Sequence, residues 1–115
     1  MTVKRIALLI LLALALHGSD RYIHIEFPNG GEVLKSGSQA RILWRSLGVS
    51  GNVAILLFLS GEQYAIIAES VPDSGAYEWK ISAALPESGQ YRLRICALKD
   101  LRVNDFSDRD FAIKK

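Results

Sequence analysis

Short stretches of alternating apolar and polar residues, separated by turn-forming residues, recur along most of this chain. After residue 18 there are seven, at residues 22–27, 39–45, 52–59, 64–69, 76–81, 90–98 and a last one that ends with Phe111 and Ile113. An alternation of period two places every second side chain on one face of a β-strand. No segment after residue 18 has a convincing helical period. The sequence therefore predicts an all-β protein.

Seven short strands without helices can bury their apolar faces only against one another. Two packed sheets with Greek-key connections meet this requirement, so the predicted fold is a seven-stranded immunoglobulin-like β-sandwich. A small barrel such as an OB-fold is the alternative, but five strands suffice for it and no basic, aromatic nucleic-acid face is visible. The length of 115 residues fits one domain, which we place at residues 19–115. Its single cysteine, Cys96, cannot form an internal disulfide.

The first 18 residues differ in composition from the rest. Lys4 and Arg5 precede an uninterrupted run of 11 apolar residues, 6–16. As a helix this run would reach only about 16 Å, about half of a bilayer core of about 30 Å. The pattern is typical of a cleaved secretory signal peptide at residues 1–18, with cleavage after Ala15 or Gly18. A retained amphipathic or signal-anchor segment is the alternative.

Removal of that segment changes the charge balance. The chain has 14 basic and 12 acidic residues, so losing Lys4 and Arg5 leaves 12 of each and lowers the formal net charge from +2 to zero. A neutral domain lacks the electrostatic attraction on which nucleic-acid and anionic-membrane binding depend. We therefore expect no nucleic-acid partner. Because a signal peptide directs export, we also expect an extracellular or envelope protein with no stable transmembrane span after cleavage.

A series of turn and core motifs between residues 25 and 113 resembles one known family. In order, these motifs are PNGGE (28–32), Gly37, ILW (42–44), NVAILL (52–57), GAYEW (75–79), LPESGQYRLRI (85–95), and Ser107-Asp108 followed by FAI (111–113). They are similar to the Ser/Thr-rich, glycosylphosphatidylinositol-anchored membrane protein family, whose module resembles the N-terminal domain of yeast cell-wall β-1,6-glucan synthesis proteins. The resemblance implies a non-catalytic extracellular module with an immunoglobulin- or fibronectin-like fold, found on cell surfaces and in wall assembly.

Two departures from the family pattern limit what can be carried over. Leu34 stands where the family usually has Trp, and no Ser/Thr-rich region or anchor signal follows the domain in this sequence. A role in glucan synthesis is therefore not expected. Separately, residues 88–93 resemble the corner before strand F of immunoglobulin domains, in which a Tyr hydroxyl bonds to nearby backbone two residues ahead of a cysteine. Tyr91 takes that role here, and Leu93 replaces the cysteine.

Residues that carry chemistry are sparse. A nucleophilic Cys/His pair would need His24 and Cys96, which are both expected to point outward, from different sheets. Acidic residues that could form catalytic pairs are scattered on turns and outer faces, where acids usually serve solubility; examples are Glu62, Glu69, Glu78 and Glu87. We expect no enzymatic activity and no cofactor.

Three other clusters favour structural interpretations. Residues 104–110 (NDFSDRD) are rich in oxygen ligands but lack the Gly and bidentate acid spacing of a calcium loop, so a polar loop with an Arg109 ion pair is preferred to a metal site. PNGGE could be an anion-binding nest of backbone amides, but turn formation explains it more simply. Four aromatic residues could form a sugar platform but lie on inward faces, which favours the core: Trp44, Tyr77, Trp79 and Tyr91.

Strand 52–59 carries the main functional prediction, because both of its alternating sets are apolar. If Val53, Ile55, Leu57 and Leu59 face the core, the opposite set points outward, next to the outward set of strand 90–98. The predicted partner-binding surface consists of Ala54, Leu56, Phe58, Arg92, Arg94, Cys96 and Leu98. An apolar patch rimmed by arginines has the composition of a protein contact surface. The alternative is that residues 64–68 or a loop cover this face.

The sequence thus predicts a secreted, non-catalytic interaction or structural module of the cell surface or envelope that binds a protein partner or a second copy of itself. Two alternatives stay open. One is a carbohydrate- or wall-binding module that uses exposed aromatics such as Tyr22 or Tyr64. The other is a secreted inhibitor that presents the loops 47–51 and 99–105 to a protease.

Overall fold

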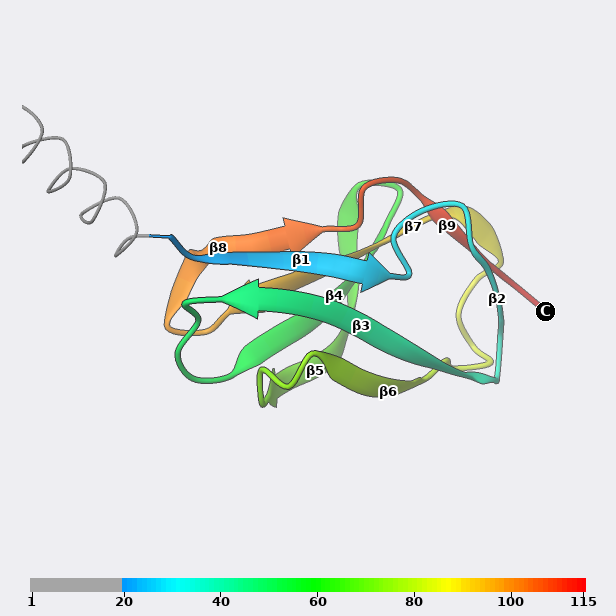
Figure 1. Ribbon diagram of the computed structural model, residues 1–115. Coiled ribbons are helices and arrows are strands. Elements are labelled where there is room, and N and C mark those ends of the chain that lie inside the picture. The colour runs from blue at the N-terminus through cyan, green and yellow to red at the C-terminus, as the bar shows by residue number, and fades with distance from the viewer. Residues whose placement is uncertain (1–19) are drawn as a thin grey trace, which may run out of the picture.

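The computed structural model describes residues 20–115, and in this range it contains nine strands and no helix (Figure 1). The predicted signal peptide at residues 1–18 lies outside the described residues. In chain order the strands are β1 (Tyr22–Phe27), β2 (Val33–Lys35), β3 (Gln39–Leu47), β4 (Val53–Leu59), β5 (Glu62–Val71), β6 (Ala76–Lys80), β7 (Ser88–Ala97), β8 (Asp100–Phe106) and β9 (Phe111–Lys114).

The strands form two sheets that pack face to face, as predicted. The smaller sheet has the order β1-β3-β6, and the larger has the order β2-β9-β7-β4-β5, with β8 also paired to β7. All pairings are antiparallel except the one between β2 and β9. Figure 1 shows β8 running beside β1, where the edges of the two sheets meet. There the backbone amide of Ile25 on β1 donates a 2.8 Å hydrogen bond to Oδ2 of Asp105 on β8.

The core lies between the sheets and consists of the inward rows that the alternation predicted. Val53, Ile55 and Leu57 of β4 are buried with Leu93 and Ile95 of β7. Their counterparts from the smaller sheet include Ile25, Ile42, Trp44 and Trp79. Tyr91 is fully buried, and its hydroxyl donates a hydrogen bond to the backbone oxygen of Pro86, which confirms the predicted tyrosine corner.

The strand count is nine and not the predicted seven. One additional strand, β2, has only three residues, too few to show an alternation. The other, β8, lies in a segment for which the sequence predicts a loop, because residues 99–110 are mostly polar. β8 and β9 both pair with β7 along the same side, one after the other, and the pairing is interrupted at residues 107–110. Because residues 100–105 belong to β8, the second of the two loops predicted for a protease inhibitor is a strand.

The interruption between β8 and β9 is held by specific contacts. Ser107 is 1% exposed; its amide donates to the backbone oxygen of Leu93, and its hydroxyl accepts a hydrogen bond from the Leu93 amide. Asn29 and Asp108 bond reciprocally, since the Asn29 side-chain amide donates to the Asp108 carboxylate and the Asp108 backbone amide donates to Asn29 Oδ1. The PNGGE turn thus anchors the segment that separates the two strands.

Candidate functional site

The two strands of the predicted surface are neighbours in the larger sheet. In the register between β4 and β7, Ala54 lies opposite Cys96, Leu56 opposite Arg94 and Phe58 opposite Arg92. Directly opposed residues of an antiparallel pair project to the same face. The structure therefore brings six of the seven predicted residues together on the outward face of the sheet.

The structure differs from the prediction in the exposure of two residues and in the position of a third. Ala54 and Cys96 are 7% and 4% exposed, so they are not available to a partner. Both belong to a row that continues to Asn104 on β8, where the sequence predicts a loop and not a strand. Leu98 is 42% exposed, but it follows the end of β7 in the turn to β8 and is not part of the row.

One row of side chains crosses four strands of the larger sheet. The register places Phe106 of β8 opposite Arg94 of β7, Arg94 opposite Leu56 of β4, and Leu56 opposite Ile66 of β5. Ile66 is 52% and Phe106 is 38% exposed, whereas Leu56 is partly buried. Together with Phe58 and Arg92 of the adjacent row, these residues form what we call the β4–β7 face.

β8 covers part of this face through Phe106. The rings of Phe106 and Phe58 meet edge to face, with centroids 4.9 Å apart and an interplanar angle of 77°. The guanidinium carbon of Arg94 lies 5.4 Å from the centroid of Phe106, and Arg94 Nε donates to Asn104 Oδ1 at 3.2 Å. The alternative that a neighbouring segment covers the face is thus realised in part, by β8.

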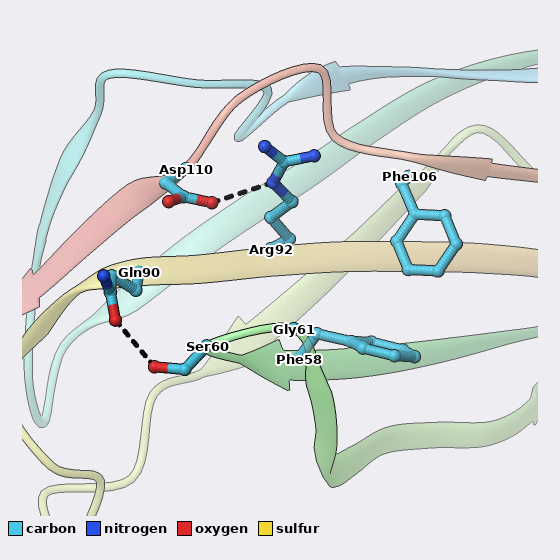
Figure 2. A pocket seen from close by; sticks show the side chains of 7 residues that line it. All are labelled: Phe58, Ser60, Gly61, Gln90, Arg92, Phe106 and Asp110. Atoms are coloured by element: carbon cyan, nitrogen blue, oxygen red, sulfur yellow. Dashed lines mark hydrogen bonds and ion pairs between the residues drawn. The ribbon is translucent and has the colours of Figure 1, made fainter.

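Beside these aromatic rings the face is hollowed, with a volume of about 500 Å³. The hollow lies where β8 and β9 are interrupted, so that on the side away from β4 no strand pairs with β7 at Arg92. Its opposite wall is the β4–β5 hairpin turn at Ser60 and Gly61, whose φ values of 52° and 84° are of the kind found in tight two-residue hairpin turns. The lining residues are Phe58, Ser60, Gly61, Gln90, Arg92, Phe106 and Asp110 (Figure 2).

Two polar pairs and two aromatic rings make up this lining. Arg92 Nε donates a 2.8 Å hydrogen bond to Asp110 Oδ1, and Ser60 Oγ donates a 2.7 Å bond to Gln90 Oε1. Figure 2 shows the two polar pairs toward one end of the hollow and both phenylalanines toward the other. This arrangement suits binding, because it combines an apolar wall with a few oriented donors and acceptors.

The other candidates have structural partners. Among the acids of residues 104–110, Asp105 accepts a bond from Ile25, Asp108 is bonded to Asn29 and Asp110 is paired with Arg92. These three carboxylates therefore serve three separate contacts. His24 is partly exposed, with Nδ1 4.0 Å from the Asp105 carboxylate. Cys96, the other residue that a nucleophilic Cys/His pair would need, is buried, although the sequence predicts that it points outward.

The PNGGE turn does form a pocket of backbone amides, and its own glutamate fills it. The amides of Asn29 and Gly30 donate to Oε2 and Oε1 of Glu32 at 2.8 and 2.7 Å. The turn interpretation is therefore correct, and the anion at these amides is a side chain of the turn itself. Of the proposed aromatic platform, Trp44, Trp79 and Tyr91 are buried, as the core interpretation predicted.

Sequence reasoning missed most of the hollow. Of its seven lining residues, only Phe58 and Arg92 were predicted. Phe106 and Asp110 flank the strand interruption, and the mixed composition of residues 104–110 did not show that two strands end there. Ser60 and Gly61 directly follow an apolar strand, and a Ser-Gly pair in that position indicates a turn but not a binding site.

A family model described as a Kre9/KNH-like N-terminal Ig-like domain matches residues 27–112. This range covers most of the chain, from the end of β1 into β9, and it includes every motif on which the resemblance was based, except for Ile113 at the end of the last motif. The chain therefore belongs to this family, which confirms the immunoglobulin-like fold and the relation to yeast cell-wall synthesis proteins. No curated protein matches the chain significantly.

Proposed function

We propose that this member of the Kre9/KNH-like N-terminal Ig-like domain family is a non-catalytic module of the cell surface or envelope that binds a protein partner through its β4–β7 face. The family supplies the cell-wall context. The observation that carries the proposal is the row of Ile66, Leu56, Arg94 and Phe106, which places exposed apolar side chains beside an arginine across four strands. Protein interfaces combine aromatic and aliphatic residues with arginine in this way.

The charges on the face define the partner's chemistry. Arg92 is paired with Asp110, but the bond from Arg94 goes to the neutral Asn104, so its positive charge is not balanced by an acid within that contact. An apolar surface with a carboxylate near its centre would complement this arrangement. The partner is thus expected to present aliphatic or aromatic residues next to Asp or Glu. A second copy of the chain is the homomeric version of the same proposal.

A charge placed in the centre of the face tests the proposal. Leu56→Asp combined with Ile66→Asp should abolish association, because two carboxylates would have to be buried in the contact. The matched control is Leu43→Asp combined with Leu47→Asp, which alters two exposed leucines on β3 of the other sheet. The tagged protein, purified from an exporting host, is used to capture partners from the envelope of its source cell, and its self-association is measured by sedimentation.

The proposal predicts that a specific partner, or the dimer, is retained by the wild type and by the β3 control and is lost with the β4–β5 variant. Circular dichroism verifies that both variants remain folded. If the β4–β5 variant associates as strongly as the wild type, the face is not the binding surface.

No transmembrane helix enters this proposal: within residues 20–115 the structure has no helix long and apolar enough to cross a membrane. A catalytic role is not proposed, because the hydroxyl and the carboxylate that line the hollow are bonded to other groups: Ser60 donates to Gln90, and Asp110 accepts from Arg92. A nucleophilic serine needs a general base within hydrogen-bond reach.

A further inference from the structure

The hollow beside Arg92 presents several polar atoms that the hydrogen bonds of the described residues do not use. The bond from Arg92 to Asp110 uses Nε and Oδ1, which leaves both Nη nitrogens of Arg92 and Oδ2 of Asp110. Gln90 accepts through Oε1, which leaves its Nε2 donor. Donors and an acceptor are thus fixed side by side at one end of the hollow.

The net charge of this polar end is zero, because Asp110 neutralises Arg92. An anionic ligand would be attracted by the guanidinium but repelled by the adjacent carboxylate. A cationic ligand would be attracted by the carboxylate but repelled by the guanidinium. A hydroxyl group both donates and accepts a hydrogen bond. Two neighbouring hydroxyls on one ligand can therefore donate to Asp110 and accept from Arg92 at the same time.

The aromatic end of the hollow favours a ligand with an apolar face. Phe58 and Phe106 form a corner whose rings meet at 77°, and Arg94 packs against Phe106 from its own strand. C–H groups are attracted to the negative face of an aromatic ring. A sugar ring carries axial C–H groups on its face and vicinal hydroxyls on its rim, so it matches both ends of the hollow.

We propose that this hollow binds a neutral sugar unit, with vicinal hydroxyls at Arg92, Asp110 and Gln90 and with the ring face against Phe58. The volume of about 500 Å³ lies within the range of small-molecule sites. The Arg92–Asp110 pair holds the guanidinium in place before the ligand arrives, so less side-chain entropy is lost on binding. This site shares Phe58, Arg92 and Phe106 with the β4–β7 face proposed above for a protein contact, but neither Leu56 nor Ile66 lines the hollow, so the two proposals can be tested separately.

Nuclear magnetic resonance titration of the isotope-labelled protein from an exporting host tests this inference. The neutral probes are maltose, cellobiose and lactose, and the charged probes are glucuronate and glucosamine. The neutral sugars should shift the backbone signals of Gly61 and Gln90 and the Nε signal of Arg92 in a saturable manner at millimolar concentration. Each charged probe should bind more weakly than the best neutral sugar.

Two substitutions of the polar pair sharpen the test. Arg92→Gln should weaken binding of the neutral sugar about tenfold or more, since it removes two charged donors. Asp110→Asn keeps the size of the side chain but leaves Arg92 unneutralised, so the preference should reverse in favour of glucuronate. The control is Arg41→Gln, which breaks a comparable surface pair with Glu78 on the smaller sheet and should leave binding unchanged.

Three results would overturn the inference. They are the absence of saturable shifts with every neutral sugar, a wild-type preference for glucuronate, and Arg92→Gln binding that equals the wild type. The spectra themselves report whether each variant is folded, through the dispersion of its amide signals. Leu56→Asp combined with Ile66→Asp should retain sugar binding, so failure of this proposal and failure of the protein-contact proposal can be told apart.

Discussion

Removal of a single hydroxyl at the tyrosine corner tests how the larger sheet is stabilised. Tyr91 is fully buried, and its ring stacks on Phe111 with centroids 6.1 Å apart and an interplanar angle of 25°. Its hydroxyl donates to the backbone oxygen of Pro86, five residues earlier. Tyr91→Phe keeps the ring and its packing and removes only that hydrogen bond.

The expected cost of Tyr91→Phe follows from the environment of the acceptor. A net intramolecular hydrogen bond contributes about 0.5–1.5 kcal/mol, and an acceptor left buried without a partner costs about 1–3 kcal/mol. Pro86 is exposed, so water can replace the hydroxyl at its carbonyl oxygen. We therefore expect a loss of about 1–1.5 kcal/mol, measured by urea denaturation, with a decrease of Tm of about 4–8 °C per kcal/mol.

The pH dependence of stability gives a second test, because the buried hydroxyl of Tyr91 can ionise and phenylalanine has no such group. Burial raises the pKa of Tyr91 above its ordinary value, with a smaller contribution from the charge of Tyr64. The advantage of wild type over Tyr91→Phe should therefore be complete below about pH 10, the ordinary tyrosine pKa, and decrease as the pH rises toward the raised value of the folded state. A stability difference that stays constant from about pH 8 to about pH 11, or one that exceeds about 3 kcal/mol, would refute the reasoning.

Two further substitutions test polar contacts elsewhere. Asp73 accepts a 2.7 Å bond from Nε1 of the buried Trp44 and another from the hydroxyl of Ser46, so Asp73→Ala should cost about 2–4 kcal/mol in urea denaturation followed by tryptophan fluorescence. Asp73→Asn, which keeps an acceptor, should cost less; equal costs would contradict this account. Hydrogen bonds from the Arg102 side chain and then its backbone amide lower the pKa of Asp100, a contribution to stability that is present above the ordinary pKa and lost as the pH falls through the lowered one. In Arg102→Gln the pKa of Asp100, followed by magnetic resonance, should rise toward its ordinary range, and an unchanged pKa would show that the side chain is not the cause.

The inward rows could be predicted because alternation and burial have the same physical origin. Strands that face a core on one side must place apolar residues at every second position, and the sequence shows this in β4, β6 and β7. The immunoglobulin topology assumed for the seven strands placed β4 beside β7, which the register confirms. Alternation says nothing about what covers the outer face, so the burial of Ala54 and Cys96 could not be read from it.

β8 escaped prediction because its pairing does not depend on an apolar row. Its sequence, DLRVNDF, mixes both kinds of residue on each face, since the strand lies at the edge where the two sheets meet. Asp105 points toward β1 and bonds the Ile25 amide, whereas Phe106 lies in the outward row beside Arg94. A strand whose inward positions satisfy backbone amides has no periodic hydrophobic signal.

Two motifs of the family resemblance, PNGGE and Ser107-Asp108, are distant in sequence but act on the same feature of the fold. Ser107 bonds both backbone groups of Leu93, and Asp108 bonds Asn29 of the turn. Gly30 has a φ of 144°, and a Cβ atom there would lie 2.6 Å from Cβ of Arg109, so only glycine lets the turn approach this closely. These contacts hold Ser107 on β7 at Leu93 and tie Asp108 to the PNGGE turn, so β8 and β9 stay separate beside Arg92, where the hollow opens. The motif residues therefore explain the shape of the hollow, whereas its ligand preference depends on Arg92, Gln90 and Asp110, which lie outside those two motifs.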